Sequence, residues 1–347
     1  MTTIDLRSDT VTLPTEAMLE RMRHAELGDD SRDGDPTVQR LEALAAARTG
    51  KAAALFVPSG TMGNLVALLA HGARGGELLC DAGAHVLRSE MGGVAAIAGL
   101  LPRILPSRRG AVELDALRAT ITPAMLPHRA ATALVWMETS HNDAGGAVLP
   151  VAHMQAVYRL AREHGVPVHI DGARLFNAAA ALGVDARALV ACADSVMFCV
   201  SKGLSAPVGS LLVGTGDFIA RARGFRRMVG GNLRQAGVIA AAGIVALEEM
   251  IERLPEDHRT AKRLAEGLAA IDPAFVDPAA IETNIVRVDV GGGRYDAARW
   301  VEALAARGVR VGAWTARQLR CVTHRHIGMG EIERALAAFA AVAREAA

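Results

Sequence analysis

The sequence has few aromatic residues, almost no net charge and no paired cysteines, and each shortage excludes a class of protein. Phe, Trp and Tyr make up 3% of the 347 residues, which leaves few platforms on which single-stranded bases could stack. The 38 Lys and Arg nearly balance the 37 Asp and Glu, so no long-range field attracts phosphate backbones or anionic lipid. We therefore expect no nucleic-acid partner and no membrane partner.

The four cysteines, Cys80, Cys192, Cys199 and Cys321, lie far apart and form no C-x-x-C pair. This spacing favours neither a zinc ribbon nor a disulfide framework, and reduced thiols indicate a cytoplasmic protein. The first residues lack the basic and apolar regions of a secretory signal, which supports the same expectation. The longest apolar run, residues 236–247, has about half of the roughly 20 residues that a membrane-spanning helix needs, so we expect a buried helix there.

What the chain does have is apolar material: 51% of its residues are hydrophobic, enough for a compact protein of two domains. Helix-period segments alternate with short β-branched runs up to about residue 214, which predicts an α/β fold with a mainly parallel sheet. We expect strands at 133–137, 166–170, 195–200 and 209–213, and helices at 38–47, 64–70, 151–164 and 239–252. A smaller α+β domain should follow, with elements at 258–269, 284–289, 295–306, 318–323 and 329–345. The expected units are an N-terminal segment 1–20 that contributes to the active site, a large domain 21–252 and a small C-terminal domain 253–347.

Residues 58–64 read PSGTMGN and open an apolar-periodic helix after a short apolar run. Hydroxyl groups such as those of Ser59 and Thr61, free backbone N–H groups and glycines such as Gly60 would suit a phosphate bound at a helix N-terminus. A helix cap whose glycines only relieve crowding explains the motif equally well. Alone, the motif leaves both interpretations open.

Two polar residues follow predicted strands. Asp171 ends the apolar stretch at 166–170, where a carboxylate lies in the ligand-binding position of an α/β sheet, although a helix N-cap is an alternative. Lys202 comes after the strand at 195–200, and burying its ammonium group is costly. Desolvation lowers the pKa of a lysine and gives the free amine that forms a Schiff base, whereas a surface lysine is the ordinary alternative.

These features together predict a site for pyridoxal 5'-phosphate. This cofactor requires an anchor for its phosphate, an acid partner for its pyridine nitrogen and a lysine for its aldehyde. Asp171 keeps the ring nitrogen protonated in this interpretation, which the ring needs in order to act as an electron sink. We expect no metal, because His324 and His326 have no Cys or acidic partner at ligand spacing.

At this point the sequence resembles a known family, the L-threonine aldolases, which are fold type I, aspartate aminotransferase-like enzymes that use pyridoxal phosphate. The matching stretches are DLRSDTVT at 5–12, DPT at 35–37, FVPSGTMGN at 56–64, ETSHNDAGGAVLP at 138–150, HIDGARLFN at 169–177, SKGLSAPVGS at 201–210 and GGNLRQAG at 230–237. They cover essentially the whole chain in order. The resemblance implies a large domain with a mainly parallel sheet and a smaller α+β C-terminal domain.

The resemblance also implies roles around the cofactor. Lys202 would hold the cofactor covalently, Asp171 would pair with its ring nitrogen, and His85 would stack on its ring. Arg227 and Arg234 would reach the phosphate from a neighbouring subunit, beside Gly60 and Thr61. The active sites would then be shared within a homotetramer built as a dimer of dimers.

For the substrate, the resemblance implies that Ser8, Arg174 and Arg320 grip a carboxylate, with Arg174 also lying among the cofactor-binding residues. The implied reaction is retro-aldol cleavage of L-threonine, L-allo-threonine or a related β-hydroxy-α-amino acid to glycine and an aldehyde. His85 and His128 are the candidates for the base that takes the β-hydroxyl proton, because neutral imidazole accepts a proton near pH 7. β-Elimination and amino-acid racemisation are the alternatives on the same scaffold, and a non-catalytic protein is a remote one.

Three positions depart from the family pattern. Arg32 stands where the family usually has tyrosine, and Leu87 and Ser89 lie where aromatic residues are common near His85. Losing those rings should widen or polarise the pocket around the substrate side chain. We therefore expect a bulkier or charged β-hydroxy amino acid to be accepted.

Overall fold

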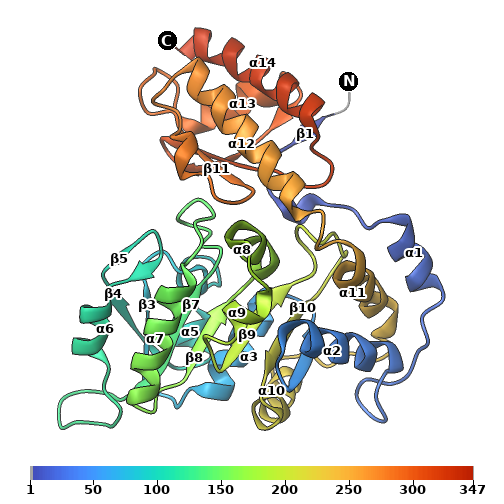
Figure 1. The fold of residues 1–347 in the computed structure, drawn as a ribbon, viewed down its shortest axis with the longest axis vertical. Helices are drawn as coiled ribbons and strands as arrows, with labels where there is room; N and C mark the ends of the chain where they lie inside the picture. Colours follow the sequence, from blue (N-terminus) through green and yellow to red (C-terminus); the bar gives the residue numbers. More distant parts are fainter. Residues whose placement is uncertain (1–2, 347) are drawn as a thin grey trace.

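The computed structural model describes residues 3–346 and shows a large lobe below a smaller one (Figure 1). Among the described residues, the central sheet of the large lobe has seven strands in the order β2-β10-β9-β8-β7-β3-β4. Their bounds are β2 Ala53–Val57, β10 Ser210–Gly214, β9 Ser195–Cys199, β8 Val168–Asp171, β7 Thr132–Glu138, β3 Glu77–Asp81 and β4 Leu101–Leu105. Only β10 of these runs antiparallel to its neighbours, so the predicted mainly parallel sheet is confirmed.

Helices pack on both faces of this sheet (Figure 1). One face is covered by α3 Gly60–His71, α5 Gly93–Ala96 and α10 Gly216–Met228. The other face packs against α2 Pro36–Thr49, α6 Leu114–Thr120, α7 Val151–Glu163, α8 Leu175–Leu182, α9 Ala186–Val190 and α11 Gly237–Glu249. The short α4, His85–Arg88, follows β3, and α1, Glu16–Arg23, packs against α11. Burial on both faces explains why β9 and β10 are nearly continuous apolar runs rather than alternating ones.

The small lobe is an antiparallel sheet in the order β11-β14-β13 with helices packed on it. Its elements are η2 Pro278–Ala280, β11 Ile285–Asp289, β13 Gly312–Thr315, β14 Gln318–Val322, α12 Leu254–Ile271, α13 Ala297–Ala305 and α14 Met329–Ala346. The N-terminal strand β1, Ile4–Asp5, belongs to this lobe, where it pairs with β12, Val309–Arg310. It then crosses through η1, Asp9–Val11, into the large lobe, which brings the N-terminal segment to the junction of the two lobes.

The predicted elements correspond closely to observed ones, and the differences have local causes. The helix expected at 64–70 starts already at Gly60, because the Ser59 hydroxyl accepts a hydrogen bond from the Met62 amide and caps it. The apolar run at 236–247 is the buried helix α11, as predicted. Three strands of the central sheet, β2, β3 and β4, were not among the expected ones. Strand β4 is mostly exposed at the sheet edge and contains Pro102, so it lacks the pattern of a half-buried strand.

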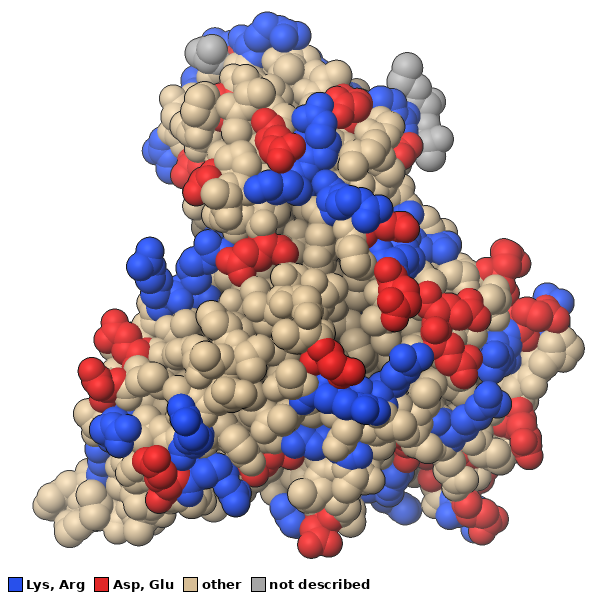
Figure 2. Space-filling model, viewed as in Figure 1, with Lys and Arg blue, Asp and Glu red and all other residues tan. Residues whose placement is uncertain are grey.

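Charge and hydropathy also agree with the composition. Basic and acidic side chains are mixed over the face seen in Figure 2 rather than gathered by sign. None of the helices in residues 3–346 is long and apolar enough to cross a membrane. The four cysteines are buried and unpaired.

Candidate active site

Two adjoining cavities lie at the carboxyl ends of the parallel strands, beside the start of α3. The larger cavity, of about 430 Å³, is lined by the start of α3 and the loop after β9. The smaller cavity, of about 250 Å³, reaches towards the small lobe. They share Thr10, His85, Asp171, Ala173 and Lys202, so the predicted lysine and aspartate lie in one continuous space. This is the ligand-binding position of an open α/β sheet.

The N-terminus of α3 forms one wall of the larger cavity. Ser59, Gly60 and Thr61 line it, as predicted, together with Ser201 from the loop after β9. A Cβ added to Gly60 would come within 3.0 Å of the Cys199 sulfur, so glycine lets the helix start close to the sheet. Free N–H groups and the positive end of the helix dipole favour an anion at this wall.

Asp171 ends β8 and is buried. Its Oδ1 accepts a hydrogen bond of 3.0 Å from the Ala173 amide, and its Oδ2 accepts one of 2.8 Å from the Asn64 side chain. The carboxylate is thus held in place by the chain itself. It faces the same cavity as the start of α3 and Lys202.

Lys202 follows β9 and lines both cavities. Its carbonyl oxygen accepts hydrogen bonds of 3.0 Å from the Thr12 hydroxyl and 2.8 Å from the Ser205 amide. The backbone on which the amine is carried is therefore held by both the N-terminal segment and its own loop.

His85 begins α4 at the boundary of the two cavities. Its backbone amide donates to Glu138 Oε2 at 2.7 Å, and its ring Nδ1 lies 2.9 Å from Glu90 Oε1. The hydrogen bond to Glu90 raises the pKa of His85, while partial burial opposes the shift. The buried carboxyl of Glu138 has a raised pKa because it is desolvated.

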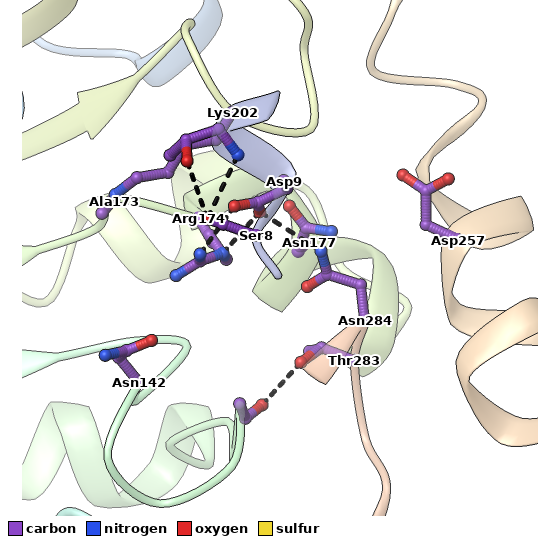
Figure 3. A network of polar contacts seen from close by, with 12 residues as sticks. Ser8, Asp9, Asn142, Ala173, Arg174, Asn177, Lys202, Asp257, Thr283 and Asn284 are labelled. Carbon is purple, nitrogen blue, oxygen red and sulfur yellow. Dashed lines mark hydrogen bonds and ion pairs between the residues drawn. The ribbon is translucent and has the colours of Figure 1, made fainter. Parts of the chain in front are cut away.

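Arg174 and Asp9 form a buried ion pair under the smaller cavity (Figure 3). Arg174 Nε and Nη2 donate to the two carboxylate oxygens at 2.6 and 2.7 Å, and the Asn284 side chain adds a third hydrogen bond of 3.2 Å. Burial alone would raise the pKa of Asp9, but Arg174 and then Lys202 hold it well below its ordinary value. Two of the three nitrogens of Arg174 are therefore committed to Asp9, which leaves Nη1 for a ligand.

Arg320 of β14 lines the smaller cavity with Ser8 and Arg174, so the three predicted carboxylate contacts do come together. Its Nη1 donates to the Arg7 carbonyl at 3.1 Å and its Nη2 to Asn142 Oδ1 at 3.0 Å. Burial, and then the neighbouring Arg174 charge, lower the pKa of Arg320 to about 10. An anion between these two guanidinium groups would stabilise their charged forms against both the burial and the mutual repulsion.

Trp314, which no motif in the sequence indicated, forms another part of the smaller cavity. The guanidinium carbon of Arg320 lies 5.6 Å from its ring centre, and that of Arg287 lies 4.7 Å away. The Trp314 Nε1 donates to Asp143 Oδ1 at 3.2 Å. The ring thus supports two stacked cations at the edge of the cavity.

Other missed residues are Asp9, Asn64, Glu90 and Ser140. Asp9 and Asn64 lie inside the family-like stretches 5–12 and 56–64, which is the signal that could have found them. Glu90 has no local signal, because its role depends on a contact with α3. Within residues 3–346, Ser140 Oγ and Arg320 Nε are buried without a hydrogen-bond partner, and both residues line the smaller cavity. Unsatisfied polar atoms at a cavity fit a polar ligand.

Three predicted residues are not brought to these cavities within the described part of the chain. His128 is exposed in the turn before β7, at the opposite end of the strand from Glu138. Arg227 and Arg234 are also exposed, and Arg234 contacts Ser31. Neither cavity is lined by any of the three. Arg227 and Arg234 were expected to act from a neighbouring subunit, so their roles stay predictions. His128 was expected at the substrate, and this chain does not place it at either cavity.

The three residues that depart from the family pattern lie in different places in the structure. Ser89 lines the smaller cavity, as expected for a residue that shapes the substrate pocket. Leu87 packs in the apolar cluster around Leu78 and Trp136. The Arg32 side chain is 79% exposed beside Asp29 and lines neither cavity, so of the three positions Ser89 alone lies at a cavity wall. The expected widening of the pocket stays a prediction.

Comparison with known proteins gives consistent results. The β-eliminating lyase family profile matches residues 5–290. The chain is 43% identical over 341 residues to a probable low-specificity L-threonine aldolase 2 of Arabidopsis thaliana, covering 97% of this chain and 96% of the relative. It is also 43% identical over 322 residues to the low specificity L-threonine aldolase of Escherichia coli K12, covering 92% and 93%.

Solved structures share the fold. Leishmania major threonine aldolase superposes with a TM-score of 0.82 at 14% identity, covering 98% of this chain and 99% of the other. A serine palmitoyltransferase structure with pyridoxal phosphate gives 0.78 at 18%, covering 99% and 88%. These likenesses show that the chain has the fold of the fold type I enzymes, as predicted.

Proposed function

The chain belongs to the β-eliminating lyase family, and from this membership we propose that its two cavities are the active site of a pyridoxal phosphate-dependent L-threonine aldolase. Such an aldehyde-lyase cleaves L-threonine, L-allo-threonine or a related β-hydroxy-α-amino acid to glycine and an aldehyde. The observation that carries the proposal is that Lys202, Asp171 and the N-terminus of α3 line one cavity in a chain 43% identical to named aldolases.

The residues of the larger cavity fit the cofactor. The start of α3, with Ser59, Gly60 and Thr61, supplies N–H and hydroxyl donors for its phosphate. Asp171 supplies the acid partner for its ring nitrogen, and Lys202 supplies the amine for its aldehyde. When bound, pyridoxal phosphate supplies an electron sink for the carbanion that remains after the carbon–carbon bond breaks.

The residues of the smaller cavity orient the substrate. Arg320, the free Nη1 of Arg174 and the Ser8 hydroxyl provide donors for a carboxylate. Asp9 fixes the plane of the Arg174 guanidinium through two hydrogen bonds, so the direction of its Nη1 is fixed as well. Holding the carboxylate decides which bond at Cα is presented for cleavage.

A proton must leave the β-hydroxyl group as the aldehyde departs. His85 is the predicted base that lines the cavity in this chain. Its Nδ1–H is engaged by Glu90, so in the neutral ring Nε2 is the acceptor atom. Because Glu90 raises the pKa of His85, the neutral form that can accept a proton becomes populated at a higher pH than in an ordinary histidine.

We propose further that the enzyme is a cytoplasmic homotetramer, built as a dimer of dimers with shared sites. Arg227 and Arg234 are exposed and lie outside the cavities of their own chain, which supports a role across an interface. Next to Arg227, the Met228 side chain is 72% exposed. Light scattering coupled to gel filtration measures the mass: about four times 36.3 kDa is expected, and a monomeric, active protein would contradict the proposal.

We also propose a division of the chain into a large domain 21–252, a small domain 253–347 and an N-terminal segment, residues 1–20. This segment acts as part of the active site. Ser8 and Thr10 on the cavity walls support this division.

Product analysis tests the reaction. The purified protein with pyridoxal phosphate is incubated separately with L-threonine, L-allo-threonine and phenylserine, and the products are identified by mass spectrometry. Glycine and the matching aldehyde are expected from each active substrate. A 2-oxo acid with ammonia would indicate β-elimination instead, and a changed enantiomer without cleavage would indicate racemisation.

A further inference from the structure

The side chain of Asn64, on the first turns of α3, lies between two buried carboxyl groups. Its Nδ2 is 2.8 Å from Asp171 Oδ2 and 2.8 Å from Glu90 Oε1. The same Glu90 oxygen lies 2.9 Å from Nδ1 of His85. Atoms of His85, Glu90 and Asp171 are within 4.8 Å of one another, so two acidic groups are packed closely here.

The chemistry of these groups fixes the direction of every hydrogen bond around Asn64. Both oxygens that Nδ2 meets are acceptors, so the amide nitrogen must face them and donate one proton to each. The remaining Oδ1 then faces His169 Nε2 at 3.4 Å, and this places a proton on Nε2 of His169.

The donor and acceptor roles of Ser195 and His71, which lie beyond His169, follow in the same way. With its proton on Nε2, the ring accepts at Nδ1 from the Ser195 hydroxyl, 2.7 Å away. The Ser195 oxygen in turn accepts from Nε2 of His71, also at 2.7 Å. Burial lowers the pKa of His169 well below its ordinary value and that of His71 to about 4, so both rings are neutral at pH 7, as this arrangement requires.

We propose that Asn64 is a positioning residue: at the end of the oriented chain His71–Ser195–His169, it holds Asp171 and Glu90 side by side as hydrogen-bond acceptors. This inference rests on the proposed function, which gives Asp171 the cofactor ring nitrogen and His85 the cofactor ring. The Asn64 amide thereby links Asp171, the partner of the cofactor ring nitrogen, to Glu90, the partner of His85. Without its two N–H groups, nothing in the described contacts separates the two carboxyl groups.

Asn64→Leu tests the proposal, because it keeps a side chain of similar size, adds no charge and removes both donors. We expect the dissociation constant for pyridoxal phosphate, measured by absorbance titration, to rise at least tenfold. A residue that only fills space would tolerate an uncharged side chain of similar size, so a dissociation constant within twofold of the wild-type value would overturn the proposal.

Glu90→Gln is the matched control. The amide Oε1 still accepts from Asn64 and His85, so the geometry survives and only the charge is lost. We expect cofactor affinity within threefold of wild type and a lower His85 pKa by histidine NMR. An unchanged His85 pKa would contradict the assigned contact.

The imidazole ¹⁵N shifts of the wild-type protein test the direction of the chain without any substitution. A neutral His169 with its proton on Nε2 is expected, and a proton on Nδ1 would overturn the proposal even if Asn64→Leu fails to fold. None of these measurements needs turnover. If wild-type protein forms no glycine but these results hold, the proposed function fails alone; if glycine forms and they do not, this inference fails alone.

Discussion

Asp9 holds Arg174 by two hydrogen bonds of 2.6 and 2.7 Å, so an acid from the N-terminal segment positions a guanidinium that follows β8. Both side chains are buried, and the pair joins the segment that leaves the small lobe to the sheet of the large one. The substrate end of the site is therefore built by parts of the chain that are 165 residues apart in sequence.

Asp9→Asn should weaken both the fold and substrate binding. The variant leaves the buried Arg174 charge without its counter-ion, and breaking such a pair costs on the order of 3–5 kcal/mol. We expect urea unfolding to show a loss of that size and the KM for the amino acid to rise. Unchanged stability and KM would show that Arg174 does not depend on Asp9.

Arg320→Lys should raise the KM for the amino acid at least tenfold, equivalent to about 1.4 kcal/mol. A lysine cannot reproduce the fork that contacts the Arg7 carbonyl and Asn142 while facing the cavity. Arg317→Lys is the control, because Arg317 is an exposed arginine three residues away that does not line the cavity. Steady-state kinetics on both variants should separate them, and equal effects would refute the assignment of Arg320.

Ser89→Phe should narrow the smaller cavity. We expect kcat/KM for phenylserine to fall at least tenfold more than kcat/KM for L-threonine, because the added ring occupies the space of the larger side chain. Arg32→Ala should leave both values within twofold, since Arg32 lies outside both cavities. A parallel loss for the two substrates in Ser89→Phe would show that Ser89 does not face the substrate side chain.

Lys202→Ala should abolish turnover and the visible absorbance of bound cofactor while leaving the circular dichroism spectrum unchanged. The change removes the amine that faces the larger cavity. Lys262→Ala is the matched control, because Lys262 contacts the Pro278 carbonyl in the small lobe. Full activity of Lys202→Ala would contradict the proposed role of the Lys202 amine.

The free energy of unfolding should fall as the pH drops from 6.5 towards 4. Burial lowers the pKa of His258 from 6.5 to about 4, so in this range the unfolded chain binds the proton that the folded chain excludes. The contribution of His258 to the free energy of unfolding is fully present above pH 6.5. On acidification it is lost by up to about 1.4 kcal/mol per pH unit. His258→Gln keeps an acceptor for Asn177 and should flatten the profile measured by urea unfolding at several pH values. An identical slope in the variant would contradict the assignment.

Much of this arrangement was predictable because it depends on local patterns. The strand ends that place Asp171 and Lys202 and the capped start of α3 follow from apolar runs and helix signals close to each residue. Ser8, Arg174 and Arg320 came from the family resemblance, and the structure brings them to one cavity.

The remainder depends on contacts between distant segments, which spacing does not encode. Glu90 touches Asn64 across 26 residues, and Asp9 meets Arg174 across 165. Whether an arginine faces substrate or a neighbouring acid is decided by such packing. His128 was expected near the substrate, but its turn precedes β7 and lies at the amino end of that strand, where a single chain cannot bring it to the cavity.

The most direct test of the central claim follows the carbon skeleton of L-threonine labelled with ¹³C at Cα. The labelled substrate is added to the protein with pyridoxal phosphate, and ¹³C NMR is recorded beside a Lys202→Ala control. The account predicts that the label appears in C2 of glycine, with acetaldehyde as the other product, and only in the wild-type sample. Label in a 2-oxo acid, or in threonine of changed configuration with no glycine formed, would contradict it.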